Sequence, residues 1–127
     1  MKKLLLSLLG VFLFTSLGFC NSYSLRLECE NYCINKGYLK DYGFQYCDKE
    51  CKFNEKEAWR IDTSHRKIEI DWQCYFDCRL GKLKSKGFCR MNCDQEFQKC
   101  YSECLEYSSP GQCVMKCNPG YNIFGND

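Results

Sequence analysis

Residues 89–104 read CRMNCDQEFQKCYSEC, with cysteines at positions 89, 93, 100 and 104. At 3.6 residues per turn these positions fall at about 0°, 40°, 20° and 60° around a helix, so one face would carry all four sulfur atoms. Cysteines four apart on a helix have Cβ atoms about 5–6 Å apart, whereas a disulfide requires about 3.5–4.5 Å. The stretch therefore predicts one continuous helix whose cysteines bond to other segments.

The same spacing recurs through the rest of the chain. Twelve of the 13 cysteines follow position 20, and all twelve form Cys-x-x-x-Cys pairs. A spacing of four is a helical period, and the only two prolines lie at expected turns. The pattern predicts an all-α fold. The pairs are 29/33, 47/51, 74/78, 89/93, 100/104 and 113/117.

Glycines bound two polar connections, GYLKDYG and GKLKSKG, which indicate turns between antiparallel helices. Asp62, Thr63 or Ser64 is available to cap the third helix, while Ser109 and Pro110 should begin the last one as N-cap and first residue. The expected helices span about 25–35, 43–60, 67–80 and 89–104, followed by one that carries Cys113 and Cys117. The tail YNIFGND should be irregular.

Antiparallel neighbours bring their inner cysteines together and their outer cysteines together, which predicts nested disulfides. Twelve cysteines allow thousands of connectivities, and an internal repeat favours the nested set. CYFDC…GFCRMNC and CYSEC…GQCVMKC match at Tyr75/Tyr101, Asp77/Glu103, Gly87/Gly111 and Met91/Met115. The predicted bonds are Cys29–Cys51, Cys33–Cys47, Cys74–Cys93, Cys78–Cys89, Cys100–Cys117 and Cys104–Cys113. The fold class is therefore a disulfide-rich series of tandem antiparallel helical hairpins.

The first 20 residues have the features of a secretory signal peptide. Lys2 and Lys3 precede the apolar run LLLSLLGVFLFTSLGF, which is too short and too close to the N-terminus for a membrane anchor. Cleavage would follow Cys20 or Ser22. A bacterial lipoprotein signal at Cys20 is the alternative, and bulky Phe19 disfavours it because that signal requires a small residue there.

An export signal and this cysteine density together predict a secreted, extracellular protein with disulfides formed in an oxidising compartment. The predicted organisation is a signal peptide at 1–20, a first hairpin at 21–60, a linker at 61–66, and two fused hairpins at 67–127 that share the central helix and end in a short tail.

The charge balance excludes several classes of partner. Two of the 18 basic residues would leave with the leader, so 16 would remain against 16 acidic residues. A nucleic-acid binder, a polycationic antimicrobial or a general membrane-surface binder requires a strong basic excess. No later apolar run approaches the length of a membrane span, so we expect no stable span.

The sequence predicts no enzyme, no cofactor and no metal site. His65 is the only histidine, and it lies in the polar linker beside Ser64. A Ser-His or Cys-His nucleophile has no supporting context there, so a solvent-exposed linker histidine is the simpler interpretation. Zinc sites use reduced thiols and usually shorter cysteine spacings, and secretion favours disulfides instead.

One group of charges, which we call the basic cluster, straddles the connection GKLKSKG. It has five cations in twelve residues with no acid among them, and Leu83 and Phe88 are interleaved. Such a run is commonly a solvated loop that keeps a neutral protein soluble. The functional interpretation is a rigid loop that recognises an acidic protein surface or presents lysine to a trypsin-like protease. The candidate binding residues are Arg79, Lys82, Lys84, Lys86, Phe88 and Arg90.

The paired Cys-x-x-x-Cys segments resemble α-helical hairpin peptides, a group that includes plant defence peptides, trypsin inhibitors and helical venom toxins. The C-x3-C-x6-C-x3-C stretch at 89–104 is similar to a helix of nemertean hairpin neurotoxins. Small mitochondrial intermembrane-space chaperones also contain twin Cys-x3-Cys hairpins, but they lack a cleaved secretory leader. The resemblance covers cysteine spacing and implies a scaffold more than an activity.

The leading hypothesis is a secreted toxin-like or defence-like protein that binds an extracellular protein, such as a receptor or an ion channel, through the basic cluster. One alternative is a serine-protease inhibitor that presents Lys82, Lys84 or Lys86. The other is a structural or signalling secreted protein without inhibitory activity.

Overall fold

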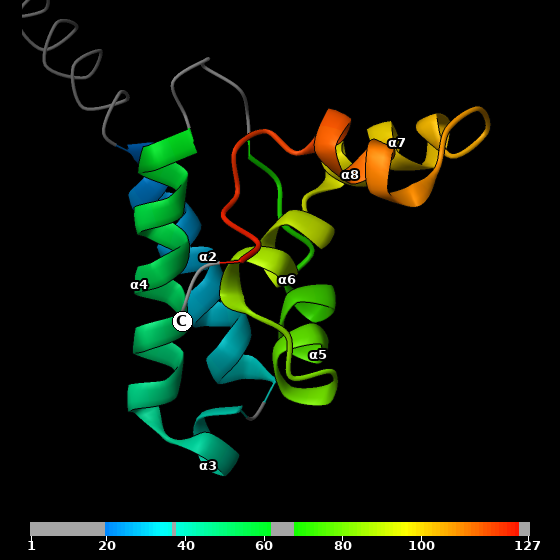
Figure 1. The fold of residues 1–127 in the computed structure, drawn as a ribbon. Helices are drawn as coiled ribbons and strands as arrows, with labels where there is room; N and C mark the ends of the chain where they lie inside the picture. Colours follow the sequence, from blue (N-terminus) through cyan, green and yellow to red (C-terminus); the bar gives the residue numbers. More distant parts are fainter. Residues whose placement is uncertain (1–19, 37, 62–67, 125–127) are drawn as a thin grey trace, which may run out of the picture. The chain divides into compact units, whose positions relative to one another are not determined.

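The computed structural model describes residues 20–36, 38–61 and 68–124. Within these ranges the regular secondary structure is helical, apart from one isolated bridge between Ile70 and Asp94. Residues 1–19 of the predicted signal peptide and residues 62–67, with His65 and the three predicted caps, lie outside the described part. The helices are α2 (Cys20–Asn35), α3 (Tyr38–Tyr42), α4 (Phe44–Ile61), α5 (Trp72–Gly81), α6 (Lys86–Asn92), α7 (Gln95–Cys104) and α8 (Pro110–Cys117) (Figure 1).

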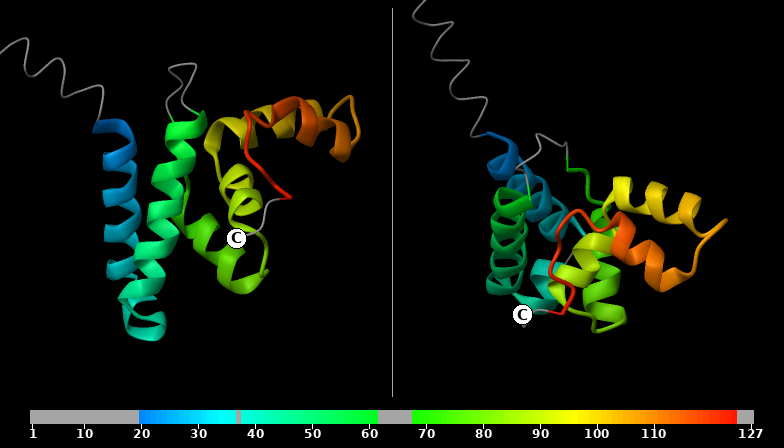
Figure 2. Two further views of the ribbon diagram at one scale, coloured as in Figure 1. Left: turned by 60° about the vertical axis from the view of Figure 1, so that its left-hand side comes forward. Right: turned by 45° about the horizontal axis from the view of Figure 1, so that its top comes forward.

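The chain divides into two compact units, residues 1–55 and residues 56–127, and each is described by itself. In the first unit α2 and α4 run antiparallel, as the left view of Figure 2 shows. The predicted connection between them contains the short helix α3, and Gly43 then turns the chain with a φ of 85°. Only glycine adopts that backbone without strain, which explains the glycine just before α4.

The second unit contains two helical hairpins, α5 with α6 and α7 with α8. The same nested pairing of inner and outer cysteines joins the helices in both units, with Cα–Cα distances of 5.6–5.9 Å. The six disulfides are those that the cysteine spacing predicts. They are Cys29–Cys51, Cys33–Cys47, Cys74–Cys93, Cys78–Cys89, Cys100–Cys117 and Cys104–Cys113.

The predicted continuous helix at 89–104 is wrong, because the chain breaks between α6 and α7. Asp94 is the N-cap of α7, and its Oδ1 accepts hydrogen bonds from the backbone N–H groups of Glu96 and Phe97. On both sides of it the backbone pairs with an extended segment. Asp71 N–H donates to Cys93 O at 2.9 Å, and Gln95 N–H donates to Glu69 O at 2.9 Å. These bonds use backbone groups that a continuous helix would need.

That extended segment also delays α5, which was expected from about residue 67 and begins at Trp72. Asp71 is its N-cap, and the Asp71 carboxylate accepts from Cys74 N–H at 3.2 Å. Ile68 and Ile70 are β-branched residues that favour extended backbone, so the local sequence agrees with a later start.

The core of the second unit is a cluster of Ile61, Met91, Phe97 and Tyr121. Tyr121 comes from the C-terminal segment, residues 118–124, which returns from α8 across α6 (red in Figure 1). The segment has no regular structure, as predicted, yet Tyr121 is only 3% exposed. The irregular tail is therefore part of the fold.

Side-chain hydrogen bonds fix the C-terminal segment. Asn118 Oδ1 accepts from the N–H groups of Gly120 and Tyr121, which closes a tight turn. The Tyr121 hydroxyl donates to Asp94 Oδ2 at 2.8 Å, and Ser85 Oγ donates to Ile123 O at 3.2 Å.

Gly87 permits the close approach of this segment to α6. A Cβ on Gly87 would lie 1.9 Å from Asn122 O, so only glycine fits there.

Candidate functional site

The structure places the basic cluster on the loop between α5 and α6 and on the helix ends beside it. Lys82 and Lys84 are exposed, whereas Arg79 and Lys86 are half-buried. We call residues 79–86 the basic tip. Phe88 lies half-buried beyond it, with the Lys84 ammonium 6.0 Å from its ring centre.

Arg90 does not belong to this surface, and its assignment to the binding residues is wrong. Its side chain is 0% exposed, and its guanidinium lies 5.3 Å from the ring centre of Tyr121. None of its three side-chain nitrogens has a hydrogen-bond acceptor among the described residues. Burial lowers the pKa of Arg90, because removal from water disfavours the charged form. The cation is covered by the C-terminal segment and cannot reach a partner.

The basic tip is held at both ends. The Cys78–Cys89 disulfide closes it across a separation of 11 residues. Lys82 N–H donates to Cys78 O at 3.3 Å, and Arg79 Nη1 donates to Lys84 O across the loop.

At the far end Ser85 caps α6, and its Oγ accepts from Phe88 N–H at 3.2 Å. A closed loop with bonds at both ends presents its apex in a defined conformation, which lowers the entropy lost on binding.

Leu83 forms the apex of the tip. Its φ of 53° is the only positive φ of a non-glycine residue in the described part of the chain. Its side chain is 84% exposed, with Lys82 on one side and Lys84 on the other. A bulky residue in this backbone region is strained, and such strain concentrates at functional sites. Leu83 is not among the predicted binding residues, and no local signal in the sequence indicates its positive φ.

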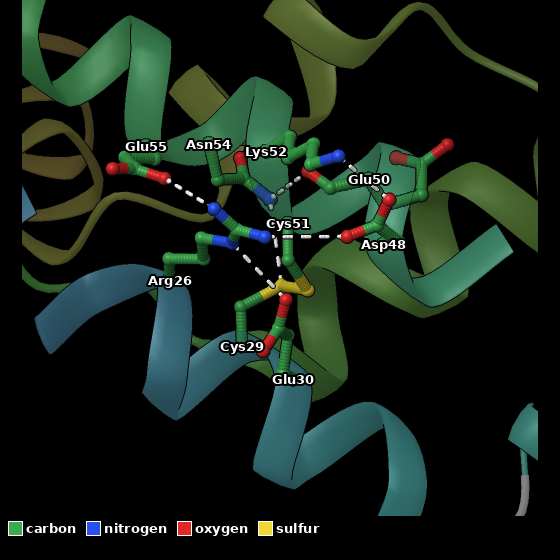
Figure 3. A network of polar contacts seen from close by, with 9 residues as sticks. All are labelled: Arg26, Cys29, Glu30, Asp48, Glu50, Cys51, Lys52, Asn54 and Glu55. Carbon is green, nitrogen blue, oxygen red and sulfur yellow. Dashed lines mark hydrogen bonds and ion pairs between the residues drawn. A yellow bond between two sulfur atoms is a disulfide. The ribbon is translucent and has the colours of Figure 1, made fainter. Parts of the chain in front are cut away.

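A second polar arrangement, centred on Arg26, lies in the first unit (Figure 3). Its guanidinium on α2 donates to Glu30 at 3.1 Å, to Glu55 at 3.2 Å and to Asp48 at 3.3 Å. Lys52 adds an ion pair of 2.9 Å to Asp48. The Arg26–Glu30 and Asp48–Lys52 pairs each lie four residues apart on one helix, a spacing that the sequence itself shows, whereas the contacts of Arg26 with Asp48 and Glu55 join two helices.

The Arg26 network joins α2 to α4, and we interpret it as structural. The hydrogen bond to Glu30, followed by that to Glu55, raises the pKa of Arg26. The hydrogen bond from Lys52, with the charges of Lys52 and Arg26, lowers the pKa of Asp48. The acidic partners of Arg26 are each about a quarter exposed, so water screens these ion pairs and they contribute little to stability. Figure 3 shows the network beside the Cys29–Cys51 disulfide, so both link α2 to α4.

The described cysteines other than Cys20 are all in disulfides, so none of these twelve offers a thiolate. Over the same ranges no group of three or more His, Cys, Asp or Glu side chains could hold a metal ion. No helix that the structure describes has the length and apolar character to cross a bilayer.

Comparison with known proteins assigns no family. No protein-family model, curated protein or solved structure matches the chain.

Proposed function

We propose that the protein is a secreted, toxin-like or defence-like binding protein whose basic tip contacts an acidic site on an extracellular protein, such as an ion channel. The observation that carries the proposal is the apex of the tip, where 84% exposed Leu83 stands between two exposed lysines on a disulfide-closed loop. Six disulfides in a short chain are typical of proteins made in an oxidising compartment, which supports secretion.

The chemistry of the tip supports an acidic protein partner that has a small apolar socket. Lysines give electrostatic attraction and fast association, while burial of a leucine contributes about 1.5–3 kcal/mol. A fluid bilayer adapts to any apolar shape, so it would gain little from the fixed backbone at Leu83. Residues 21–127 also carry equal numbers of basic and acidic side chains, unlike a general membrane binder.

The protease-inhibitor alternative has less support. Recognition of an extended peptide needs backbone that can pair as a strand with the partner. The positive φ of Leu83 interrupts such backbone between Lys82 and Lys84. A lysine presented to a protease pocket would therefore have curved backbone beside it.

The charge requirement is tested by a triple variant in which Lys82, Lys84 and Lys86 become glutamine. Its matched control replaces three exposed lysines elsewhere, Lys49, Lys56 and Lys99, and has the same net charge. The oxidised proteins would be applied to voltage-clamped neurons and assayed against trypsin.

We expect a change in membrane current with the unmodified protein and the control variant, and a loss of about tenfold or more in potency with the tip variant. Equal potency of the two triple variants would exclude the basic tip as the contact surface. Trypsin inhibition that disappears in the tip variant would favour the inhibitor alternative.

Leu83 is tested separately from the charges. Leu83→Ala should lower potency in the same assay while Leu105→Ala, at another partly exposed leucine (41% exposed), should not. If potency depended on the lysines but not on Leu83, the partner would have no apolar socket for Leu83, while the charge requirement would stand.

A further inference from the structure

The internal repeat places equivalent residues on the same face of α6 and α8. Gly87 and Gly111 each precede the first cysteine of their helix by two positions, and Met91 and Met115 each follow it by two. At 3.6 residues per turn, these positions lie about 160–200° from that cysteine. Since the cysteine points to the partner helix of the hairpin, this face, which we call the back face, points away from it.

The back face of α6 is covered by the C-terminal segment. Asn122 O occupies the space that a Cβ on Gly87 would fill. Tyr121 packs in the core cluster with Met91, which is 1% exposed. The back face of α6 therefore binds an irregular, non-helical segment of the same chain. That segment has an aromatic residue and an aliphatic residue two positions apart, Tyr121 and Ile123.

The back face of α8 is bare. Apart from its two chain neighbours and the backbone of its own helix, no described atom lies within 4 Å of a Cβ built on Gly111. Met115 is 84% exposed, although its equivalent Met91 is buried. A hollow of about 300 Å³ opens beside it, which we call the α8 groove. Its walls are Val114, Met115 and Asn118 from α8 and its end, with Tyr121, Asn122, Ile123 and Phe124 opposite.

We propose that the α8 groove binds a non-helical peptide segment of a partner protein, with the same aromatic-x-aliphatic chemistry as residues 121–123. Gly111 does not line the groove but lies on the same back face, four residues before Met115; the bound segment would continue from the groove to it and place a backbone carbonyl there, as Asn122 does against Gly87. Adaptable Met115 and 90% exposed Phe124 would cover its apolar side chains. This site is separate from the basic tip and does not depend on the function proposed for it.

No contact within the described chain explains why position 111 is a glycine. Glycine within a helix is less favourable than alanine, and at position 87 the approach of Asn122 accounts for it. No described neighbour accounts for it at position 111, and its φ is not in the region that requires glycine. The backbone of a bound partner, approaching α8 at this position, would account for the glycine.

The chain's own C-terminal segment is not available as the occupant. Three hydrogen bonds hold it in place: the Tyr121 hydroxyl to Asp94 at the start of α7, Ser85 at the start of α6 to Ile123 O, and Arg60 of α4 to Gly120 O. A second copy of the chain uses its own segment in the same way. The proposal therefore commits to a segment of a separate protein as the occupant.

The test uses a fluorescein-labelled synthetic peptide with the sequence of residues 118–124, NPGYNIF, and the oxidised protein. Fluorescence anisotropy should show saturable binding that disappears when the peptide tyrosine is replaced by alanine. Gly111→Ala should weaken binding by about tenfold or more, because the added methyl group occupies the carbonyl position. Gly81→Ala is the matched control, since the Cβ it adds also meets no described atom within 4 Å and Gly81 belongs to α5, not to the back face of α8.

Met115→Ala is the second variant, and it should weaken binding without any loss of stability because the side chain is so exposed. Equal binding by the unmodified protein and Gly111→Ala would overturn the proposal, as would the absence of saturable binding. Sedimentation that reveals self-association lost in Met115→Ala would also overturn it, by making a second copy the occupant.

Discussion

Replacement of Gly87 by alanine should loosen the C-terminal segment and destabilise the second unit. The new Cβ would lie 1.9 Å from Asn122 O and 2.8 Å from Asn122 C, whereas real Cβ contacts below 3.0 Å essentially do not occur. The atom in the way is backbone, so no side-chain rotation relieves the clash. The carbonyl has to move by about 1 Å or more.

The cost follows from what that movement breaks. A shift of residue 122 strains its neighbours, and with them the bonds from the Tyr121 hydroxyl to Asp94 and from Ser85 to Ile123. A hydrogen bond to a charged group is worth about 1.5–3 kcal/mol and a neutral one about 0.5–1.5 kcal/mol. Alanine recovers up to about 1 kcal/mol through its better helix propensity. The net loss in the free energy of unfolding should be about 1–3 kcal/mol.

Guanidinium unfolding of the oxidised protein, followed by tryptophan fluorescence, would measure this loss. Hydrogen exchange should be faster in residues 118–124 of the variant. Gly111→Ala is the matched control, because no described atom obstructs its Cβ, and its stability should be unchanged or higher by up to about 1 kcal/mol. If the two variants were equally stable, the packing of the C-terminal segment against α6 would be refuted.

Three further changes test the remaining polar contacts. Arg90→Met should leave the free energy of unfolding unchanged or raise it by up to about 4 kcal/mol, because it removes an unpaired buried charge; a clear loss in urea unfolding would contradict this. Asp94→Ala should cost about 2–4 kcal/mol in the same assay, since it removes the cap of α7 and the acceptor for Tyr121, and a cost below about 1 kcal/mol would argue against both roles. The hydrogen bond from Lys52 holds the pKa of Asp48 below its ordinary value of 3.8, so Asp48 stabilises the first unit above about pH 4 and ceases to do so as the pH falls through the lowered pKa. Asp48→Asn should remove this part of the acid dependence, and a carboxyl that titrates by NMR at the ordinary value would contradict it.

Much of the fold could be predicted from spacing. The six Cys-x-x-x-Cys pairs and the glycine-bounded connections predicted antiparallel hairpins with nested disulfides, and Ser109 and Pro110 begin α8 at the expected positions. These features depend on residues close together in the chain, where helical period and turn chemistry decide the structure.

The break between α6 and α7 had a local signal that the cysteine pattern outweighed. Asp94 followed by Gln95 and Glu96 is a favourable helix start, since an aspartate cap precedes an acid in the first turn. The positions of the four cysteines on one helical face favoured a continuous helix just as strongly. Pairing of Asp71 and Glu69 with residues on either side of Asp94 decides between the two, and that pairing joins segments more than 20 residues apart in the chain.

Only part of the candidate site could be predicted. Lys82 and Lys84 are exposed because a polar loop between two helices faces water. Arg90 has the same charge and lies close in sequence, yet it is buried because Tyr121, 31 residues later, packs over it. Charge alone could not distinguish the two environments.

The sequence by itself determined the helical hairpin architecture, the disulfide pairs and the position of the basic tip, because helical period, turn residues and cysteine spacing act over a few residues. The tertiary structure alone decided that the tip ends in a strained, exposed Leu83, that Arg90 is covered, and that the back face of α6 is filled while that of α8 is bare. Two equivalent halves of a repeat have different surroundings because a single C-terminal segment can cover only one of them.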